Sequence, residues 1–172
     1  MAVIYNLAAT SQQVVLNDDI SIDIPATAQK ITKEDALNHA AKRFNNDRTA
    51  LKSINYIHTD HIYKFNNILV SLNVSDKTLN VKSTYLSELK KGLDIMAKRG
   101  KATGYTSSLK KINNNTVLTT VEIQGNVVYC NFYCLNANNT REITGTLHYH
   151  KDDATEAATI LDHLLNSIKF KD

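Results

Sequence analysis

The sequence predicts an α+β domain built as an α/β/α sandwich, an antiparallel sheet of about six or seven strands with helices on both faces. Strand patterns alternate with three helix patterns, and the turns between strands are too short for a parallel crossover. The segment Val127–Leu135 is apolar on both faces and therefore needs cover on both sides. The 172 residues, 42% hydrophobic and 22% charged, fit one domain over residues 1–172.

The first part of the chain predicts strands and one helix. Apolar and polar residues alternate in Val14–Pro25, which predicts two strands around a turn. Thr32, with Asp35 three residues later, is typical of a helix start, and we expect this helix to end at Asn45-Asn46-Asp47. The next predicted strands are Ile54–Thr59, His61–Phe65 and Ile68–Val74.

A second helix is predicted within Leu79–Arg99. It ends at Gly100, and Lys98 and Arg99 suit the negative end of its dipole. Its apolar face consists of Tyr85, Leu86, Leu89, Leu93 and Met96. The strands that follow are Thr106–Lys111, Val117–Gln124, Val127–Leu135 and Glu142–Tyr149.

The last helix and the long hairpin before it carry local signals. Gly125-Asn126 between two strands predicts a type II′ turn. Asp153 with Glu156 resembles a capping box, which predicts a helix start. The apolar stripe of this helix consists of Ala157, Ala158, Leu161, Leu164, Leu165 and Ile168.

Two cysteines lie in one predicted strand. Cys130 and Cys134 are four residues apart, about 13 Å along a strand, whereas a disulfide needs Cα atoms within about 7 Å. We expect both to be small buried hydrophobic residues, and an apolar setting argues against Cys130 as a nucleophile. Free thiols favour a reducing compartment, although buried thiols also survive export.

Two groups of histidines are candidate metal ligands. His58, Asp60 and His61 are the densest set of metal-capable side chains and could hold a divalent metal if they converge in a turn. The alternative is a solvated turn. His148 and His150 share one face of a strand and could contribute to a metal site with further ligands. Their alternative is a solvent-facing strand end.

Basic residues gather along the second helix and beyond it, at Lys90-Lys91, Lys98–Lys101 and Lys110-Lys111. They indicate an acidic partner or an anionic surface. The alternative is a solvated helix face, which the interleaved Glu88 and Asp94 favour. The net charge of +3 does not by itself call for nucleic acid, and we expect no nucleic-acid partner.

Several classes of function have no motif here. The sequence contains no Gly-rich phosphate loop, no G-x-S-x-G and no H-E-x-x-H, so we predict neither an enzyme nor a cofactor. No run reaches the roughly 18 apolar residues of a membrane span. Residues 1–10 do not read as a signal peptide. The chain is expected to be cytoplasmic as written, or in the cell envelope or secreted if Met1 replaces a removed signal peptide.

Six segments, in their order and spacing, carry a resemblance to a known family. They are Ile20–Pro25 (ISIDIP), Tyr63–Val74 (YKFNNILVSLNV), Tyr85–Met96 (YLSELKKGLDIM), Val121–Cys134 (VEIQGNVVYCNFYC), Ile143–Tyr149 (ITGTLHY) and Ile160–Lys171 (ILDHLLNSIKFK). Over roughly Val14 to Lys171 the chain resembles the PsbP-like superfamily, which includes PsbP, the Mog-type Ran-binding proteins and DcrB-type bacterial lipoproteins.

The resemblance implies a non-enzymatic binding domain with an antiparallel sheet between helical layers. Members serve as adaptors, assembly factors or envelope proteins, and some related bacterial domains act as chaperones. The leading hypothesis is therefore a non-catalytic protein-binding or adaptor module of bacterial type, with another protein as its partner. The alternatives are a secreted or lipid-anchored envelope protein, and a metal-binding protein or hydrolase whose site carries no motif.

Overall fold

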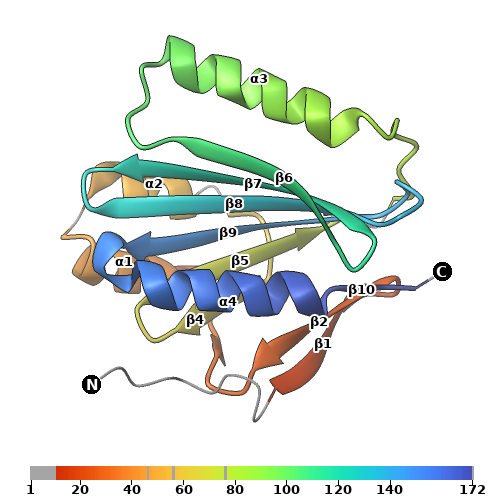
Figure 1. The fold of residues 1–172 in the computed structure, drawn as a ribbon. Helices are drawn as coiled ribbons and strands as arrows, with labels where there is room; N and C mark the ends of the chain where they lie inside the picture. The colour runs from red at the N-terminus through yellow and green to blue at the C-terminus, as the bar shows by residue number, and fades with distance from the viewer. Residues whose placement is uncertain (1–10, 46, 56, 76, 172) are drawn as a thin grey trace.

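The computed structural model describes residues 11–45, 47–55, 57–75 and 77–171 and contains two sheets (Figure 1). The large sheet has seven strands in the order β3-β4-β5-β9-β8-β7-β6, and the small sheet has the order β1-β2-β10. The small sheet consists of β1 (Ser11–Asn17), β2 (Ile20–Pro25) and β10 (Lys169–Phe170). The large sheet consists of β3 (Gln29–Lys30), β4 (His61–Phe65), β5 (Ile68–Val74), β6 (Thr106–Ile112), β7 (Asn115–Gln124), β8 (Val127–Leu135) and β9 (Glu142–His150).

Helices cover both faces of the large sheet. They are α1 (Lys33–Arg43), α2 (Arg48–Asn55), α3 (Tyr85–Arg99) and α4 (Ala154–Ser167). One face packs against α4 and the small sheet. The opposite face packs against α1 and α2 in one cluster and against α3 in another. All strand pairs are antiparallel, so the predicted α/β/α sandwich with an antiparallel sheet is confirmed.

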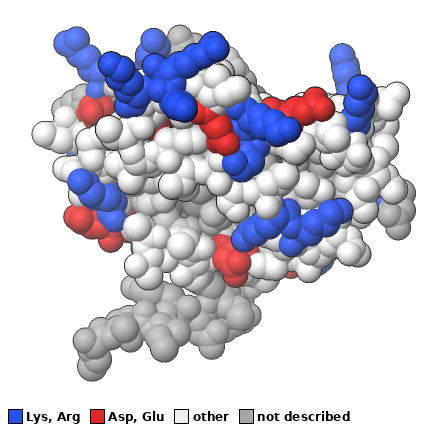
Figure 2. Space-filling model, turned by 45° about the horizontal axis from the view of Figure 1, so that its top comes forward, with Lys and Arg blue, Asp and Glu red and all other residues white. Residues whose placement is uncertain are grey.

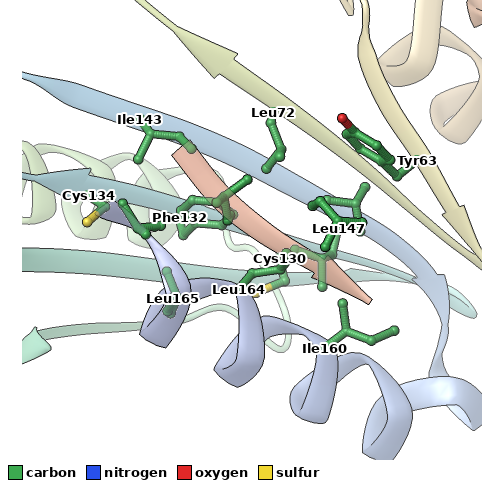
Figure 3. Packing of buried hydrophobic residues seen from close by; sticks show 14 of the residues in the cluster. Tyr63, Leu72, Cys130, Phe132, Cys134, Ile143, Leu147, Ile160, Leu164 and Leu165 are labelled. Carbon is green, nitrogen blue, oxygen red and sulfur yellow. The ribbon is translucent and has the colours of Figure 1, made fainter. Parts of the chain in front are cut away.

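Strand β8 lies inside the sheet and is covered on both sides, as its two apolar faces predicted. Cys130 and Phe132 belong to the cluster beneath α4, whereas Tyr129 packs with α1 and α2. Figure 3 shows Cys130 and Phe132 near Leu164 of α4. Phe132 lies opposite Gly145 of β9. A Cβ atom added at Gly145 would lie 2.3 Å from Cε1 of the ring, so the ring occupies the space that glycine leaves.

Several predicted boundaries are confirmed. Thr32 and Asp35 form a reciprocal capping box at the start of α1. Gly100 caps the C-terminal end of α3. Gly125, the first residue of the β7–β8 turn, has the positive φ of 61° that a type II′ turn requires there. In the described part of the chain, no helix is both long enough and apolar enough to cross a membrane.

The predicted strand Ile54–Thr59 is wrong, because Ile54 belongs to helix α2. The Asp47 carboxylate accepts hydrogen bonds of 2.9 Å from the backbone N–H groups of Thr49 and Ala50. Asp47 therefore starts a second helix where the sequence suggested only the end of the first. Ala50 and Ile54, four residues apart, bury one face of that helix.

The predicted capping box of the last helix is also wrong. The Asp153 side chain makes no cap hydrogen bond, because its carboxylate pairs with Arg43 at 2.7 Å. A 3-10 turn, η2 (Lys151–Asp153), leads into α4 instead. In the apolar stripe, Ile160 is buried, whereas the predicted Ala158 is exposed.

Three of the segments discussed from the sequence include residues outside those described. Residues 1–10, which we do not expect to be a signal peptide, lie outside them. Asn46 of the predicted turn and Tyr56 of the predicted strand also lie outside the described residues.

Candidate functional site

The three predicted metal ligands do not line one hollow. His58 and Asp60 are exposed between α2 and β4, where they line a hollow of about 580 Å³ beside the start of α1. His61 is half-buried and is not among the residues that line this hollow. Burial, followed by the nearby Lys30 charge, lowers the pKa of His61. Among the described residues, no three His, Cys, Asp or Glu side chains form a group that could hold a metal ion, and the metal site stays a prediction.

His148 does not lie at a solvent-facing strand end, and that expectation is corrected. The residue is only 1% exposed, because β9 is an inner strand and α2 covers this face of the sheet at His148. Its Nε2 atom lies 2.8 Å from Oγ of Ser53 on α2, and its ring meets Tyr129 edge-on with centroids 5.4 Å apart. Burial lowers the pKa of His148 to about 4, so the imidazole is neutral near pH 7.

The Ser53–His148 contact has the distance of a nucleophile and its base, but lacks the other requirements. A general base works best when its pKa lies near the operating pH, and that of His148 is about 4. A third group normally orients the base. The Nδ1 atom of His148 is buried without a hydrogen-bond partner among the described residues. The pair attaches α2 to the sheet, and the pKa of His148 and the lack of an orienting partner among the described residues do not favour a catalytic dyad.

Beside His148, a row of uncharged polar side chains crosses the sheet. Its members lie directly opposite one another on five neighbouring strands. They are Ser71, Thr146, Asn131, Thr120 and Ser107. Oγ1 of Thr146 donates to Oδ1 of Asn131 at 2.8 Å. The row separates the cluster beneath α1 and α2 from the cluster beneath α3.

A polar hollow of about 220 Å³ opens at one end of this row, next to Ser53 and His148. Among the described residues, no Asp, Glu, Lys or Arg side chain lines it. Neither the row nor the hollow was predicted from the sequence. The available signal was a single polar residue inside an apolar strand, such as Ser71 in β5 or Asn131 in β8.

The two cysteines are buried and free, as predicted. Burial raises the pKa of the Cys130 thiol to about 11 and that of Cys134 to about 12. At neutral pH both are protonated thiols, which are poor nucleophiles.

Helix α3 presents apolar residues to solvent, which the sequence did not predict. Leu86 is buried, and Leu89 and Leu93 are half-buried against the sheet. The predicted apolar face placed Met96 with them, but Met96 is 69% exposed and its neighbour Ile95 is 51% exposed. One further turn from Leu89 and Leu93 leads to Ala97, which is half-buried. At about 100° per residue, Ile95 falls on the opposite side of the helix, whereas Met96, seven residues after Leu89, lies at the edge of the buried face near the end of α3.

Exposed cations lie around these two apolar residues. We define the α3 outer surface by its exposed residues, which are Glu88, Lys91, Gly92, Ile95, Met96, Lys98 and Arg99. Figure 2 shows Lys and Arg side chains gathered over the end of the molecule that carries α3. Among the described residues, Lys91, Lys98 and Arg99 make no ion pair, whereas Lys90 pairs with Asp94 at 2.7 Å.

The acidic residues that interleave with the basic clusters accept hydrogen bonds from other residues of the chain. Asp94 accepts hydrogen bonds from Lys90, Tyr105 and Ser107 at 2.7, 3.2 and 2.6 Å. These hydrogen bonds, with that from Lys90 first, hold its pKa below the usual value. Glu88 accepts a 2.8 Å hydrogen bond from Thr84. Glu88 is the one exposed carboxylate of α3, and with Lys91, Lys98 and Arg99 exposed beside it the α3 outer surface remains positive.

No protein-family model and no curated protein matches the sequence. Among solved structures, the Ran-binding protein Mog1p of Saccharomyces cerevisiae is similar over 94% of this chain and 95% of that chain, with 11% identity and a TM-score of 0.45. A single-residue mutant of Mog1 is similar over 95% of this chain and 97% of that chain, with 11% identity and a TM-score of 0.46. Membership of the PsbP-like superfamily stays a prediction, and the likeness assigns this chain no function.

Proposed function

We propose that this chain is a non-catalytic protein-binding module, acting as an adaptor or assembly factor, and that it meets its partner through the α3 outer surface. The observation that carries the proposal is the exposure of Ile95 and Met96 as neighbours on one helix face. Single exposed apolar residues are ordinary, whereas adjacent ones within a polar rim are typical of interaction sites. Met is also adaptable in shape, which suits a binding surface.

The chemistry of the interior supports a binding role over a catalytic one. The thiols of Cys130 and Cys134 have raised pKa values, so they are poorly suited to nucleophilic attack. His148 has a pKa of about 4, so it is poorly suited to act as a base at neutral pH. The side chains in this chain that most resemble catalytic residues are thus better suited to packing in the interior.

Affinity capture with paired variants tests the proposal. The wild-type chain, an Ile95→Ser/Met96→Ser variant and a Val15→Ser variant are immobilised and exposed to extract from the native host. Val15 is 61% exposed on β1, in the small sheet, and is the matched control. Substitutions at such exposed positions usually change stability by less than about 0.5 kcal/mol, so a loss of binding reports on the surface.

We expect a protein that the wild type and Val15→Ser retain and that the double variant loses by at least about tenfold, or about 1.4 kcal/mol. Equal retention by all three proteins would show that the contact lies elsewhere. No specifically retained protein, even after chemical crosslinking, would reject the protein-binding role.

A further inference from the structure

We propose that the segment docking on the α3 outer surface is an acidic amphipathic helix of another protein. This inference rests on the proposed function and adds the chemistry of the partner. It follows from the charges around Ile95 and Met96 and from an open glycine beside them.

Lys91, Lys98 and Arg99 are exposed and make no ion pair among the described residues. Asp94 is held by Lys90 and Ser107, and Glu88 is the one exposed carboxylate of α3, so three cations face a single anion on this surface. A partner with Asp or Glu around its apolar residues would complement this rim. Such rim charges act mainly on the association rate and on the choice of partner, and salt weakens them.

Gly92 supplies an independent observation. It lies in the interior of α3, where glycine is a poor helix former, and a Cβ atom there would meet nothing within 4 Å. No contact with the described part of the chain therefore requires glycine at this position. Ile95 and Met96 follow it by three and four residues, so they lie beside it one turn along the helix. The bare backbone at Gly92 would let a partner helix approach α3 closely.

The same features favour a protein over other anionic partners. A helix that binds a membrane surface buries a long apolar face, whereas large apolar side chains on this surface are only Ile95 and Met96. Single-stranded nucleic acid is held by aromatic stacking in a basic groove, and the α3 outer surface contains no aromatic residue. An amphipathic helix with apolar residues at i, i+3 and i+4 matches the spacing of this surface.

The test uses three labelled synthetic peptides and fluorescence anisotropy. The first has about 18 residues, or five helical turns, with Leu at i, i+3, i+4 spacing and Glu elsewhere. The second has Lys in place of Glu. The third has the composition of the first in scrambled order. We expect the ordered acidic peptide to bind at least about tenfold more tightly than the other two, and more weakly as salt increases.

Matched variants locate the binding. Lys98→Glu reverses a charge in the last turn of α3, and Lys42→Glu does the same in the last turn of α1. We expect about fivefold weaker binding only for Lys98→Glu. Gly92→Leu covers this backbone with a side chain whose Cβ meets no described atom within 4 Å, so it should weaken binding by about the same factor while leaving the melting temperature unchanged or higher.

Three results would overturn the inference: equal binding of the acidic and basic peptides, equal effects of Lys98→Glu and Lys42→Glu, or full binding by Gly92→Leu. Tighter binding to anionic lipid vesicles or to DNA than to the ordered acidic peptide would also overturn it. If the Ile95→Ser/Met96→Ser variant loses a captured protein while acidic peptides fail to bind, the proposed function stands and the acidic-helix inference fails.

Discussion

Gly145→Ala adds one methyl group at the most crowded point of the sheet interior. The new Cβ would lie 2.3 Å from Cε1 and 2.4 Å from Cζ of Phe132, and 3.1 Å from Cδ2 of Leu72. Carbon atoms in good contact lie about 3.5–4.0 Å apart, so the ring must withdraw by more than about 1 Å. Phe132 is 0% exposed and is enclosed by the cluster beneath α4, which leaves the ring no open space.

The expected cost is a difference between two effects. Overpacking a well-packed core costs about 1–3 kcal/mol. Replacing a strand glycine by alanine returns about 0.5–1 kcal/mol. We therefore expect the unfolding free energy of Gly145→Ala to fall by about 1–2 kcal/mol, which lowers the melting temperature by roughly 2–8 °C in a chain of this length.

Urea unfolding followed by circular dichroism measures this change, with two further variants as controls. Gly92→Ala lies in open space and should raise the unfolding free energy by about 0.5–1 kcal/mol. In a Phe132→Leu background the ring atoms are gone, so Gly145→Ala should become nearly neutral, with a coupling of about 1 kcal/mol or more. A Gly145→Ala protein as stable as wild type, or the same loss in both backgrounds, would refute the packing argument.

Three further predictions concern the interior. The folded-state pKa of His148 is about 4, below the unfolded value of about 6.5. As the pH falls, the unfolded chain therefore binds the proton before the folded chain does. The unfolding free energy should fall by about 3 kcal/mol between pH 6.5 and pH 4. In urea titrations at several pH values, His148→Gln should remove this contribution to the pH dependence of the unfolding free energy. Cys130 and Cys134 are buried and should react with a thiol reagent only after denaturant is added, and rapid labelling of the folded protein would contradict their placement. Leu164→Ala truncates a fully buried side chain and should lower the unfolding free energy by about 2–5 kcal/mol. Leu161 is half-buried, so Leu161→Ala should lower it by less than half as much in the same urea assay.

Elements whose signals are local could be predicted from the sequence. β4, β5 and the β7–β8 hairpin follow from alternation and turn residues, and Gly125 has the backbone angle expected of it. The two-sided apolar pattern of β8 also predicted helices on both faces of the sheet. These signals are contained in a few consecutive residues, so no knowledge of the tertiary contacts is needed to interpret them.

The predictions from sequence fail where a residue far away in the sequence determines the local structure. Asp153 has the sequence context of a helix cap, but Arg43 from α1 takes its carboxylate. His148 and its neighbour His150 share a strand face, yet whether that face is buried depends on α2, which lies far from β9 in the sequence. The row from Ser71 to Ser107 becomes visible only when the order of the strands is known.

The polar row also explains why α3 can present a surface of its own. A continuous apolar face would favour the packing of α3 beside α1 and α2 in one layer, but Asn131 and Thr120 interrupt that face. Helix α3 is therefore held over β7 and β8 by its own small cluster, centred on Leu86 near its first turn. Ile95 and Met96, near its last turn, lie outside that cluster and are exposed. The residues that divide the sheet face thus leave the end of α3 with an accessible side, where the proposed partner would bind.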